Sequence, residues 1–321
     1  MMTSPGTKLA PLIGFAVALA VLPVMGADPP LFEDGGRVTK LGGGCAFTEG
    51  PAADADGSVY FSDCPNNRIM VLPPGGEVKV WKTGTRGANG MLFDGQGRLV
   101  TCNSQLAPDG RTVTRFEKDG KVTLLADRYD GKKLNSPNDL AIDSRGRIYF
   151  TDPRYGKTDD LEQDRMAVYR IEAGGRLTRV IDDVQVPNGI LITPDDRTIC
   201  VADNNPAQGG NRMLVAYDVQ PDGKVRRRAV LHDFGAGRGV DGMKLDVKGN
   251  IYATAGEGEK TGVYVISPEG KLLAFARTPE TATNCTFGGK DLKTLYVTAG
   301  QSIYSLGTVN RGWLRYPSSA P

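Results

Sequence analysis

Two carboxylates and four carboxamides recur at matched points of a sixfold repeat, and their oxygens could together bind a hard divalent cation. The repeat segments start with Glu49-Gly50-Pro51, Asn89-Gly90-Met91, Asn138-Asp139-Leu140, Asn188-Gly189-Ile190, Asp241-Gly242-Met243 and Asn284-Cys285-Thr286. A second marker follows each polar residue 14 or 15 positions later, in the order Asp63, Asn103, Asp152, Asp203, Ala255 and Ala299. Oxygen donors of this kind suit Ca²⁺, Mg²⁺ or Mn²⁺, and two carboxylates balance one divalent charge. The series contains no His and no Cys apart from Cys285 beside Asn284, which disfavours a zinc site.

The elements that carry these residues are predicted to be β-hairpins. In each unit a short strand leads through a Gly/Asp turn into a strand rich in β-branched and aromatic residues, as in residues 143–152. A second hairpin follows in most units. Four strands per unit, six units and a period of roughly 40 to 52 residues predict an all-β fold, a six-bladed β-propeller. Residues 37–41 could supply the outer strand that the sixth unit lacks, and so close the ring.

The innermost strand of each blade lines the central channel of a propeller, so the six polar residues should converge at one end of that channel. We expect the second markers Asp63, Asn103, Asp152 and Asp203 to form a layer behind them and to hold the ring carboxamides by hydrogen bonds. The alternative is a purely structural series, because Asn-Gly and Asp-Gly pairs are common turn formers. Loops 104–112, 126–137, 153–166 and 204–212 should shape the pocket, with Arg154, Tyr155 and Arg212 as candidate contacts.

The bulk composition excludes some partners and indicates export. The net charge is +2 without a basic stripe, which argues against nucleic acid, and Arg226-Arg227-Arg228 is interpreted as a solvated face. Residues 1–27 resemble a signal peptide, cleaved or retained as an anchor, and residues 28–321 are expected to form a single propeller domain. The protein is therefore predicted to be periplasmic or secreted, without stable membrane insertion after cleavage.

The five cysteines are an odd number for an exported protein, so at least one thiol is free or pairs between chains. A disulfide between Cys45 and Cys64 is one expectation, because both lie near the ring-facing end of the first unit. Cys102, Cys200 and Cys285 lie within predicted strands and are interpreted as small core residues.

Several stretches resemble the senescence marker protein/gluconolactonase (regucalcin-like) family of six-bladed propellers. They are residues 47–51, 136–140 with 148–153, 187–189, 240–243 and 283–289, which together extend over most of residues 45–306. The resemblance implies a divalent cation, first Ca²⁺ with Mn²⁺, Mg²⁺ or Zn²⁺ as alternatives, held by Glu49, Asn188 and Asp241. It implies Asn138 as a further ligand or substrate contact, Asp241 as the catalytic acid/base, and Asn89 and Asn284 as wall or substrate contacts.

The same resemblance implies hydrolysis of a sugar lactone, a small-molecule substrate. Asp241 would act as a base toward water or attack the substrate directly, and the sequence leaves both mechanisms open. A phosphotriesterase-type hydrolase and a non-catalytic propeller that binds a sugar or a protein around a structural cation are the alternative functions. The chain departs from family patterns at residues 103–105 and at Ser136, so these motifs do not identify the substrate. A Ser-His-Asp hydrolase is disfavoured, because the only histidine, His232, lies in a predicted outer strand.

Overall fold

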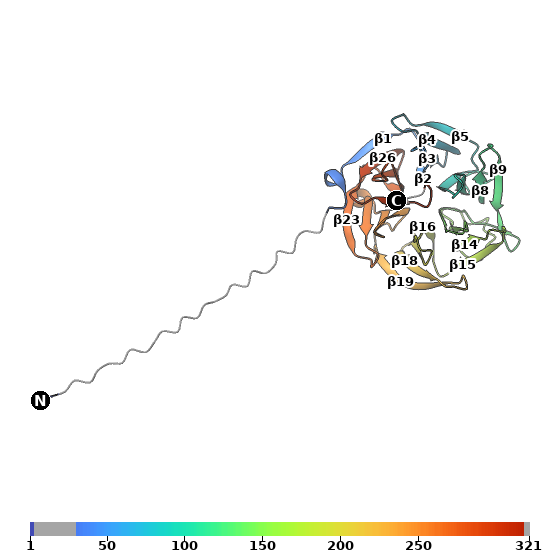
Figure 1. The fold of residues 1–321 in the computed structure, drawn as a ribbon. Coiled ribbons are helices and arrows are strands. Elements are labelled where there is room, and N and C mark those ends of the chain that lie inside the picture. Colours follow the sequence, from blue (N-terminus) through green and yellow to red (C-terminus); the bar gives the residue numbers. More distant parts are fainter. Residues whose placement is uncertain (3–29, 318–321) are drawn as a thin grey trace.

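The computed structural model describes residues 1–2 and 30–317, and its elements are almost entirely β-strands. Six antiparallel sheets, each with at least four strands, are arranged around a central axis (Figure 1). The prediction of an all-β, six-bladed β-propeller is confirmed. Two 3₁₀ turns, η1 (Glu33–Gly36) and η2 (Gly258–Lys260), and a small hairpin of β10 (Arg128–Tyr129) with β11 (Lys132–Lys133) complete the described elements.

The blades follow one another along the chain, and the strands of each blade are ordered from the axis outward. Blade 1 holds β2 (Thr48–Ala53), β3 (Val59–Asp63), β4 (Arg68–Leu72) and β5 (Lys79–Thr83). Blade 2 holds β6 (Ala88–Phe93), β7 (Leu99–Asn103), β8 (Thr112–Phe116) and β9 (Val122–Ala126). Blade 3 holds β12 (Leu140–Ile142), β13 (Ile148–Asp152), β14 (Ala167–Ile171) and β15 (Leu177–Ile181).

The second half of the ring repeats this order. Blade 4 holds β16 (Pro187–Ile192), β17 (Thr198–Asn204), β18 (Arg212–Val219) and β19 (Val225–Asp233). Blade 5 holds β20 (Met243–Asp246), β21 (Ile251–Ala255), β22 (Gly262–Ile266) and β23 (Leu272–Arg277). Blade 6 holds β24 (Ala282–Gly288), β25 (Thr294–Ala299), β26 (Ser302–Gly307) and, as its outer strand, β1 (Val38–Gly42).

The ring is closed by the N-terminal part of the domain. Strand β1 pairs antiparallel with β26, with Val38 opposite Leu306. This is the closure that the sequence predicts for residues 37–41, and it places the first strand of the domain in the same sheet as the three strands of the last blade. Neither β1 nor β26 is then left as a separate unpaired strand, which limits the sheet edges open to association.

Burial decreases from the axis outward, as the sequence of the strands requires. Every residue of β2 and β24 on the inside is buried, whereas every residue of the outer strand β5 is exposed. Middle strands such as β13 are also buried throughout, because neighbouring blades cover both of their faces. The apolar core therefore lies between blades, in clusters that join side chains of adjacent sheets such as Cys102, Leu140 and Phe150.

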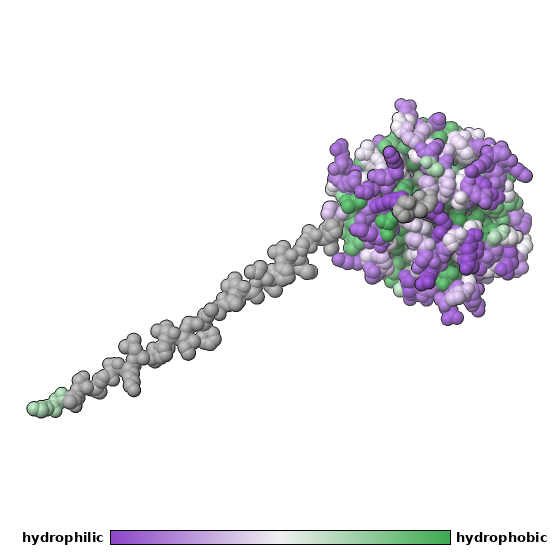
Figure 2. Space-filling view, viewed as in Figure 1, coloured by the Kyte–Doolittle hydropathy of each residue, from purple (hydrophilic) through white to green (hydrophobic). Residues whose placement is uncertain are grey.

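The C-terminal segment lies across one end of the channel (Figure 1). Strand β27 (Gly312–Trp313) extends blade 5 by pairing with β20, with Trp313 opposite Leu245. The Arg315 side chain donates from Nε to the Ile142 carbonyl oxygen at 2.9 Å and from Nη2 to Asp196 at 2.6 Å. Figure 2 shows this face of the molecule, on which hydrophilic side chains predominate around the rim with smaller hydrophobic areas between them.

Other sequence-based expectations have mixed outcomes. All five cysteines are buried free thiols, so the expected disulfide between Cys45 and Cys64 is absent, and the core positions of the other three are confirmed. His232 lies on the outer strand β19, as predicted. Apart from Met1 and Met2, the predicted signal segment 1–27 lies outside the described residues, so the domain division there stays a prediction. Among the described residues, no helix has the length and apolarity that a membrane crossing requires.

Candidate active site

The end of the channel opposite the C-terminal segment opens into a cavity of about 500 Å³. Its lining consists of Phe47, Glu49, Asn89, Asn138, Tyr155, Asn188, Asn204, Pro206, Arg212, Ala236, Arg238, Asp241 and Glu257. Five of the six repeat residues therefore converge there, from five different blades. These five supply two buried carboxylates and three carboxamides, and Asn204 adds a fourth carboxamide, so the cavity is rich in oxygen atoms.

The polar residues sit in irregular strand pairing, not in turns. The register shifts between Glu49 and Ala52, between Pro187 and Ile190, and between Ala282 and Asn284. Such bulges redirect side chains and are frequent beside functional sites. In blades 3 and 5 the inner strands β12 and β20 start only after the polar residue. The alternative interpretation of the Asn-Gly and Asp-Gly pairs as turn formers is therefore wrong.

The glycines of these pairs allow neighbouring inner strands to approach one another. A Cβ atom on Gly189 would lie 2.1 Å from the Asp241 carbonyl oxygen, and one on Gly242 would lie 2.1 Å from the Asn284 amide. Real side chains do not tolerate such distances, so any larger residue would push the blades apart. The Gly that follows a ring residue thus determines how closely the next ring residue can pack.

Glu49 is held through one of its two carboxylate oxygens. Its Oε2 accepts hydrogen bonds from the Gly50 amide at 2.7 Å and from Asn284 Nδ2 at 3.1 Å. No described residue donates to Oε1, and Glu49 is only 3% exposed. Burial and, second to it, the negative charge of Asp241 hold the pKa of Glu49 well above its ordinary value.

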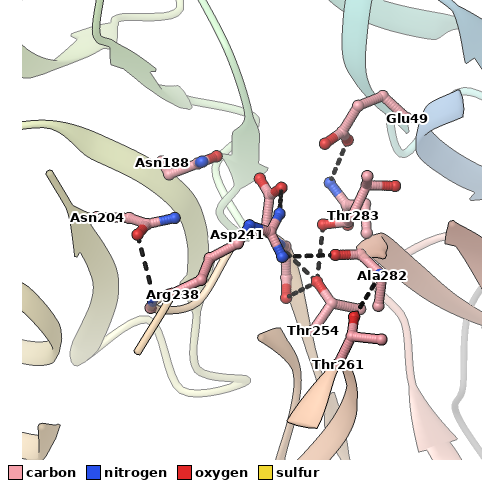
Figure 3. Close-up of polar contacts among 12 residues, drawn as sticks. Glu49, Asn188, Asn204, Arg238, Asp241, Thr254, Thr261, Ala282 and Thr283 are labelled. Carbon is pink, nitrogen blue, oxygen red and sulfur yellow. Dashed lines mark hydrogen bonds and ion pairs between the residues drawn. The ribbon is translucent and has the colours of Figure 1, made fainter. Parts of the chain in front are cut away.

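Asp241 is paired with an arginine that the sequence interpretation did not include. Arg238 Nη2 donates to Asp241 Oδ2, and the Arg238 side chain extends toward Asp241 in Figure 3. Burial raises the pKa of Asp241, while the Arg238 charge and the Asn188 amide act in the opposite direction. The only signal for Arg238 in the sequence is its position three residues before a ring carboxylate.

Asn284, the sixth repeat residue, does not line the cavity. It is buried behind Glu49, and its Nδ2 donates to Glu49 Oε2 at 3.1 Å and to Asp139 Oδ2 at 3.4 Å. Asp139 is itself fully enclosed; burial raises its pKa, and the Lys244 charge opposes that effect. The structure therefore gives Asn284 a role in fixing Glu49, and its predicted contact with substrate would require substrate to pass the cavity floor.

The second markers do not hold the ring carboxamides, so that expectation is wrong. Asp152 accepts the amide N–H groups of Asn135 and Ser136, at 2.8 and 2.7 Å. Asp203 accepts those of Gln185 and Val186 in the same manner, and Asp63 those of Ala46 and Phe47. These carboxylates fix the backbone that enters each inner strand. They position the ring residues through the main chain, because these N–H groups precede the first residue of each inner strand, where ladder pairing has not yet begun.

The loop side chains are divided between the cavity and the interior. Tyr155 lines the cavity, and its hydroxyl accepts a hydrogen bond from Asn188 Nδ2 at 3.0 Å. Arg212 also lines it, but donates to the carbonyl oxygens of Gly210 and Ala207 in its own loop. Arg154 instead pairs with Asp160 and is buried away from the cavity. Of the predicted loop contacts, Tyr155 and Arg212 are therefore well placed and Arg154 is not.

Comparison with known proteins agrees with this arrangement. The model of the SMP-30/gluconolactonase/LRE-like region matches residues 47–301. The chain belongs to this family. It is 28% identical to the gluconolactonase of Zymomonas mobilis over 83% of this chain and 80% of that protein. It is 26% identical to rabbit (Oryctolagus cuniculus) regucalcin over 80% of this chain and 84% of that protein.

A solved structure of the family has the same fold. The gluconolactonase of Xanthomonas campestris superimposes with a TM-score of 0.76 and 32% identity, over 87% of this chain and 91% of that chain. The family membership inferred from the sequence motifs is thereby confirmed. The matched region begins at Phe47 and ends at Gln301, so it contains every repeat residue from Glu49 to Asn284.

The donor set of this SMP-30/gluconolactonase-like cavity fits a divalent cation. Glu49 and Asp241 are both buried, and the negative charge of Asp241 raises the pKa of Glu49. A positive charge between the two carboxylates would offset their mutual repulsion. Asn89 Oδ1 is buried and accepts no hydrogen bond from the described residues, so it is an acceptor that lacks a donor. The described residues contain no metal cluster of three or more His, Cys, Asp or Glu side chains. The cavity differs from such clusters because amide oxygens accompany its two carboxylates, which suits Ca²⁺ or Mg²⁺.

Proposed function

We propose that this protein is a divalent-cation-dependent hydrolase of a sugar lactone or a related cyclic ester. One observation carries the proposal: the buried pair Glu49 and Asp241 faces an open cavity together with the carboxamides Asn138 and Asn188. Relatives named gluconolactonase, lactonohydrolase and 6-deoxy-6-sulfogluconolactonase support the reaction class. Ca²⁺ is the first candidate for the cation, and relatives named regucalcin are consistent with it.

Glu49, Asn188 and Asp241 would hold the cation, with Asn138 as a further ligand or a substrate contact. Bound there, the cation would act as a Lewis acid toward the carbonyl oxygen of the lactone. Asn89 also lines the cavity and could donate to, or accept from, a substrate hydroxyl. Arg212, Arg238 and Tyr155 also line the cavity, and their side chains carry hydrogen-bond donors suited to a polar sugar ring.

Asp241 would move the proton in this reaction. Its Oδ2 carries the Arg238 contact, so we assign the proton transfer to Oδ1. We infer that Oδ1 accepts the proton of the attacking water and returns it to the ring oxygen as the carbon–oxygen bond breaks. The alternative is direct attack of Oδ1 on the carbonyl carbon. Direct attack would give a mixed anhydride with release of the ring oxygen as a hydroxyl. A single turnover in H₂¹⁸O separates the two, since only hydrolysis of that anhydride at the Asp241 carboxyl carbon labels the residue.

A pH-indicator assay tests the function. Glucono-1,5-lactone and related lactones are incubated with the protein, with EDTA, and with EDTA followed by excess Ca²⁺, Mn²⁺, Mg²⁺ or Zn²⁺. We expect acid release above the spontaneous rate that EDTA abolishes and a cation restores. Failure on lactones and phosphotriesters, with a cation still bound, would instead favour a binding propeller with a structural cation.

Export also stays a proposal. The apolar segment that suggests it belongs to residues 1–27, most of which lie outside the described part of the chain. Expression of the full chain with fractionation, followed by N-terminal sequencing of the exported form, tests it. A protein found only in the cytoplasm with residues 1–27 intact would contradict it.

A further inference from the structure

Arg238 is held against the cavity wall independently of the carboxylate that it contacts. Its Nη1 donates to the Ala282 carbonyl oxygen at 2.8 Å and lies 3.5 Å from the Gly256 carbonyl oxygen. The Gly256 amide in turn donates to the Arg238 carbonyl oxygen at 2.9 Å. Figure 3 shows the side chain reaching from its loop to Asp241. The guanidinium is thus anchored on one side by main-chain oxygens and presents Nη2 to Asp241 on the other.

This guanidinium is the local counter-charge of the carboxylate pair. Among the described residues, Arg238 is the only Lys, Arg or His side chain within ion-pairing distance of Glu49 or Asp241. The second cavity arginine, Arg212, donates only to carbonyl oxygens of its own loop. Glu49 is held by an amide side chain and a backbone N–H, which are both uncharged. A cation at Asp241 and the Arg238 guanidinium would therefore compensate the same negative charge, that of the Asp241 carboxylate.

We propose that Arg238 exchanges with the divalent cation at Asp241. In the cation-free protein, Nη2 holds Asp241 and supplies the charge that a buried carboxylate needs. When a cation binds between Glu49 and Asp241, Nη2 leaves Asp241, while Nη1 keeps the Ala282 carbonyl as its anchor. The guanidinium and the cation are both positively charged, so they repel each other when both lie beside Asp241. Arg238 therefore lowers the affinity for the cation and stabilises the cation-free fold. This inference rests on the proposed cation site.

The test compares Arg238→Met with the wild-type protein by two measurements. Isothermal titration with CaCl₂ gives the Kd, and thermal unfolding gives Tm in EDTA and in saturating Ca²⁺. We expect Ca²⁺ to bind the variant about tenfold more tightly or better, because the repulsion is gone. We expect Tm to fall in EDTA and to change little in Ca²⁺, so the Ca²⁺-induced shift in Tm increases.

Two further variants separate the exchange from general effects. Arg212→Met removes a cavity arginine that contacts no carboxylate, and its Kd should stay within about threefold of wild type. Arg238→Lys keeps the positive charge, but a lysine cannot contact Asp241 and the Ala282 carbonyl oxygen through two separate nitrogens. Its Kd for Ca²⁺ should therefore lie between those of wild type and Arg238→Met.

The outcomes are distinguishable from failure of the proposed function. Weaker or unchanged Ca²⁺ binding in Arg238→Met, or an equal fall in Tm with and without Ca²⁺, overturns the exchange and leaves Arg238 a structural residue. Absence of Ca²⁺, Mn²⁺ and Mg²⁺ binding in the wild-type protein overturns the cation site itself, and the exchange with it.

Discussion

The two ends of the central channel are built from the same six inner strands and differ in almost everything else. Where the strands begin, polar residues such as Glu49, Asn188 and Asp241 face an open cavity. Where they end, apolar residues such as Ile142, Ile192 and Leu245 meet the C-terminal segment that contains Trp313 and Leu314. One strand, β20, connects both: Asp241 precedes it by two residues and Leu245 lies near its last residue.

This difference shows that the two ends of the inner strands have different roles, packing at the closed end and a polar cavity at the open end. At the closed end, side chains bury apolar area and the C-terminal segment completes the packing, which contributes stability. At the open end, carboxylates are buried without enough partners, which costs stability but creates a site that favours a cation. Changes at one end should therefore alter reaction or cation binding, and changes at the other should alter unfolding.

The largest effect is expected at the open end from Asp241→Asn. We expect kcat/KM for lactone hydrolysis to fall by about 10³-fold or more, because the proposed proton acceptor is removed. Circular dichroism and Tm should show that the fold is kept. The matched control is Asp246→Asn, on the same blade at the other end of β20, where the carboxylate bonds Asn250 and Asn310. That variant should lose stability and keep its kcat/KM; retained activity in Asp241→Asn would contradict the assignment.

At the closed end, Leu314→Ala should affect stability and not chemistry. Leu314 is 6% exposed and packs in the cluster that joins blades 1, 5 and 6. We expect a loss of about 2–3 kcal/mol in the free energy of unfolding, measured by urea denaturation. The Kd for Ca²⁺ and kcat/KM of the folded variant should match the wild type. A parallel loss of cation affinity would show that the two ends are not separate.

The pH dependence of cation binding should be a property of the open end alone. Burial and mutual charge raise the pKa of Glu49, and burial raises that of Asp241, so both carboxyl groups lose their protons at higher pH than usual. Since the cation needs ionised ligands, affinity should rise with pH, by up to about tenfold per unit for each proton displaced.

Without the cation, the free energy of unfolding should change in the opposite direction and decrease as pH rises. Each pKa is higher in the folded than in the unfolded protein, so the cation-free fold should lose stability as pH rises above the ordinary carboxyl range. Titrations with Ca²⁺ and Tm measurements in EDTA at several pH values between about 5 and 8 check both trends. A Kd that does not change with pH would contradict the assignment of buried, raised carboxyl groups.

The smallest effect is expected from Tyr155→Phe. Its hydroxyl accepts the Asn188 Nδ2–H, so Oδ1 is the Asn188 amide atom that would bind the proposed cation. Loss of the hydroxyl should weaken Ca²⁺ binding by about threefold to tenfold and leave Tm in EDTA nearly unchanged. A large fall in Tm with no change in Kd would instead make Tyr155 a packing residue.

The sequence was sufficient for the fold and for most of the ring. Repeat phase alone predicts that Glu49, Asn89, Asn138, Asn188 and Asp241 meet, because equal positions in equal blades lie at equal heights. It also predicts the closure by residues 37–41. These features follow from the periodicity of the repeat, which the spacing of the residues gives directly.

Features that depend on contacts between blades could not be predicted in the same way. The second markers Asp63, Asp152 and Asp203 bond backbone N–H groups that precede the inner strands, and the periodic pattern does not show which N–H groups lack a strand partner. Asn284 lies behind Glu49 since its amide is drawn to Asp139, a neighbour from another blade. Arg238 comes from a loop between β19 and β20, whose path the repeat does not determine. The sequence thus locates the ring but not the partners of each member.

The central claim is that a cation held by Glu49, Asn188 and Asp241 is required for hydrolysis at the open end. The most direct test titrates Ca²⁺ into the EDTA-treated protein and follows binding by calorimetry and lactone hydrolysis in parallel, for wild type and Glu49→Gln. We expect activity to recover at the Ca²⁺ concentration at which binding is half complete, and Glu49→Gln to shift both curves together by about 100-fold. Full hydrolysis by protein that elemental analysis shows to be free of metal would contradict the claim.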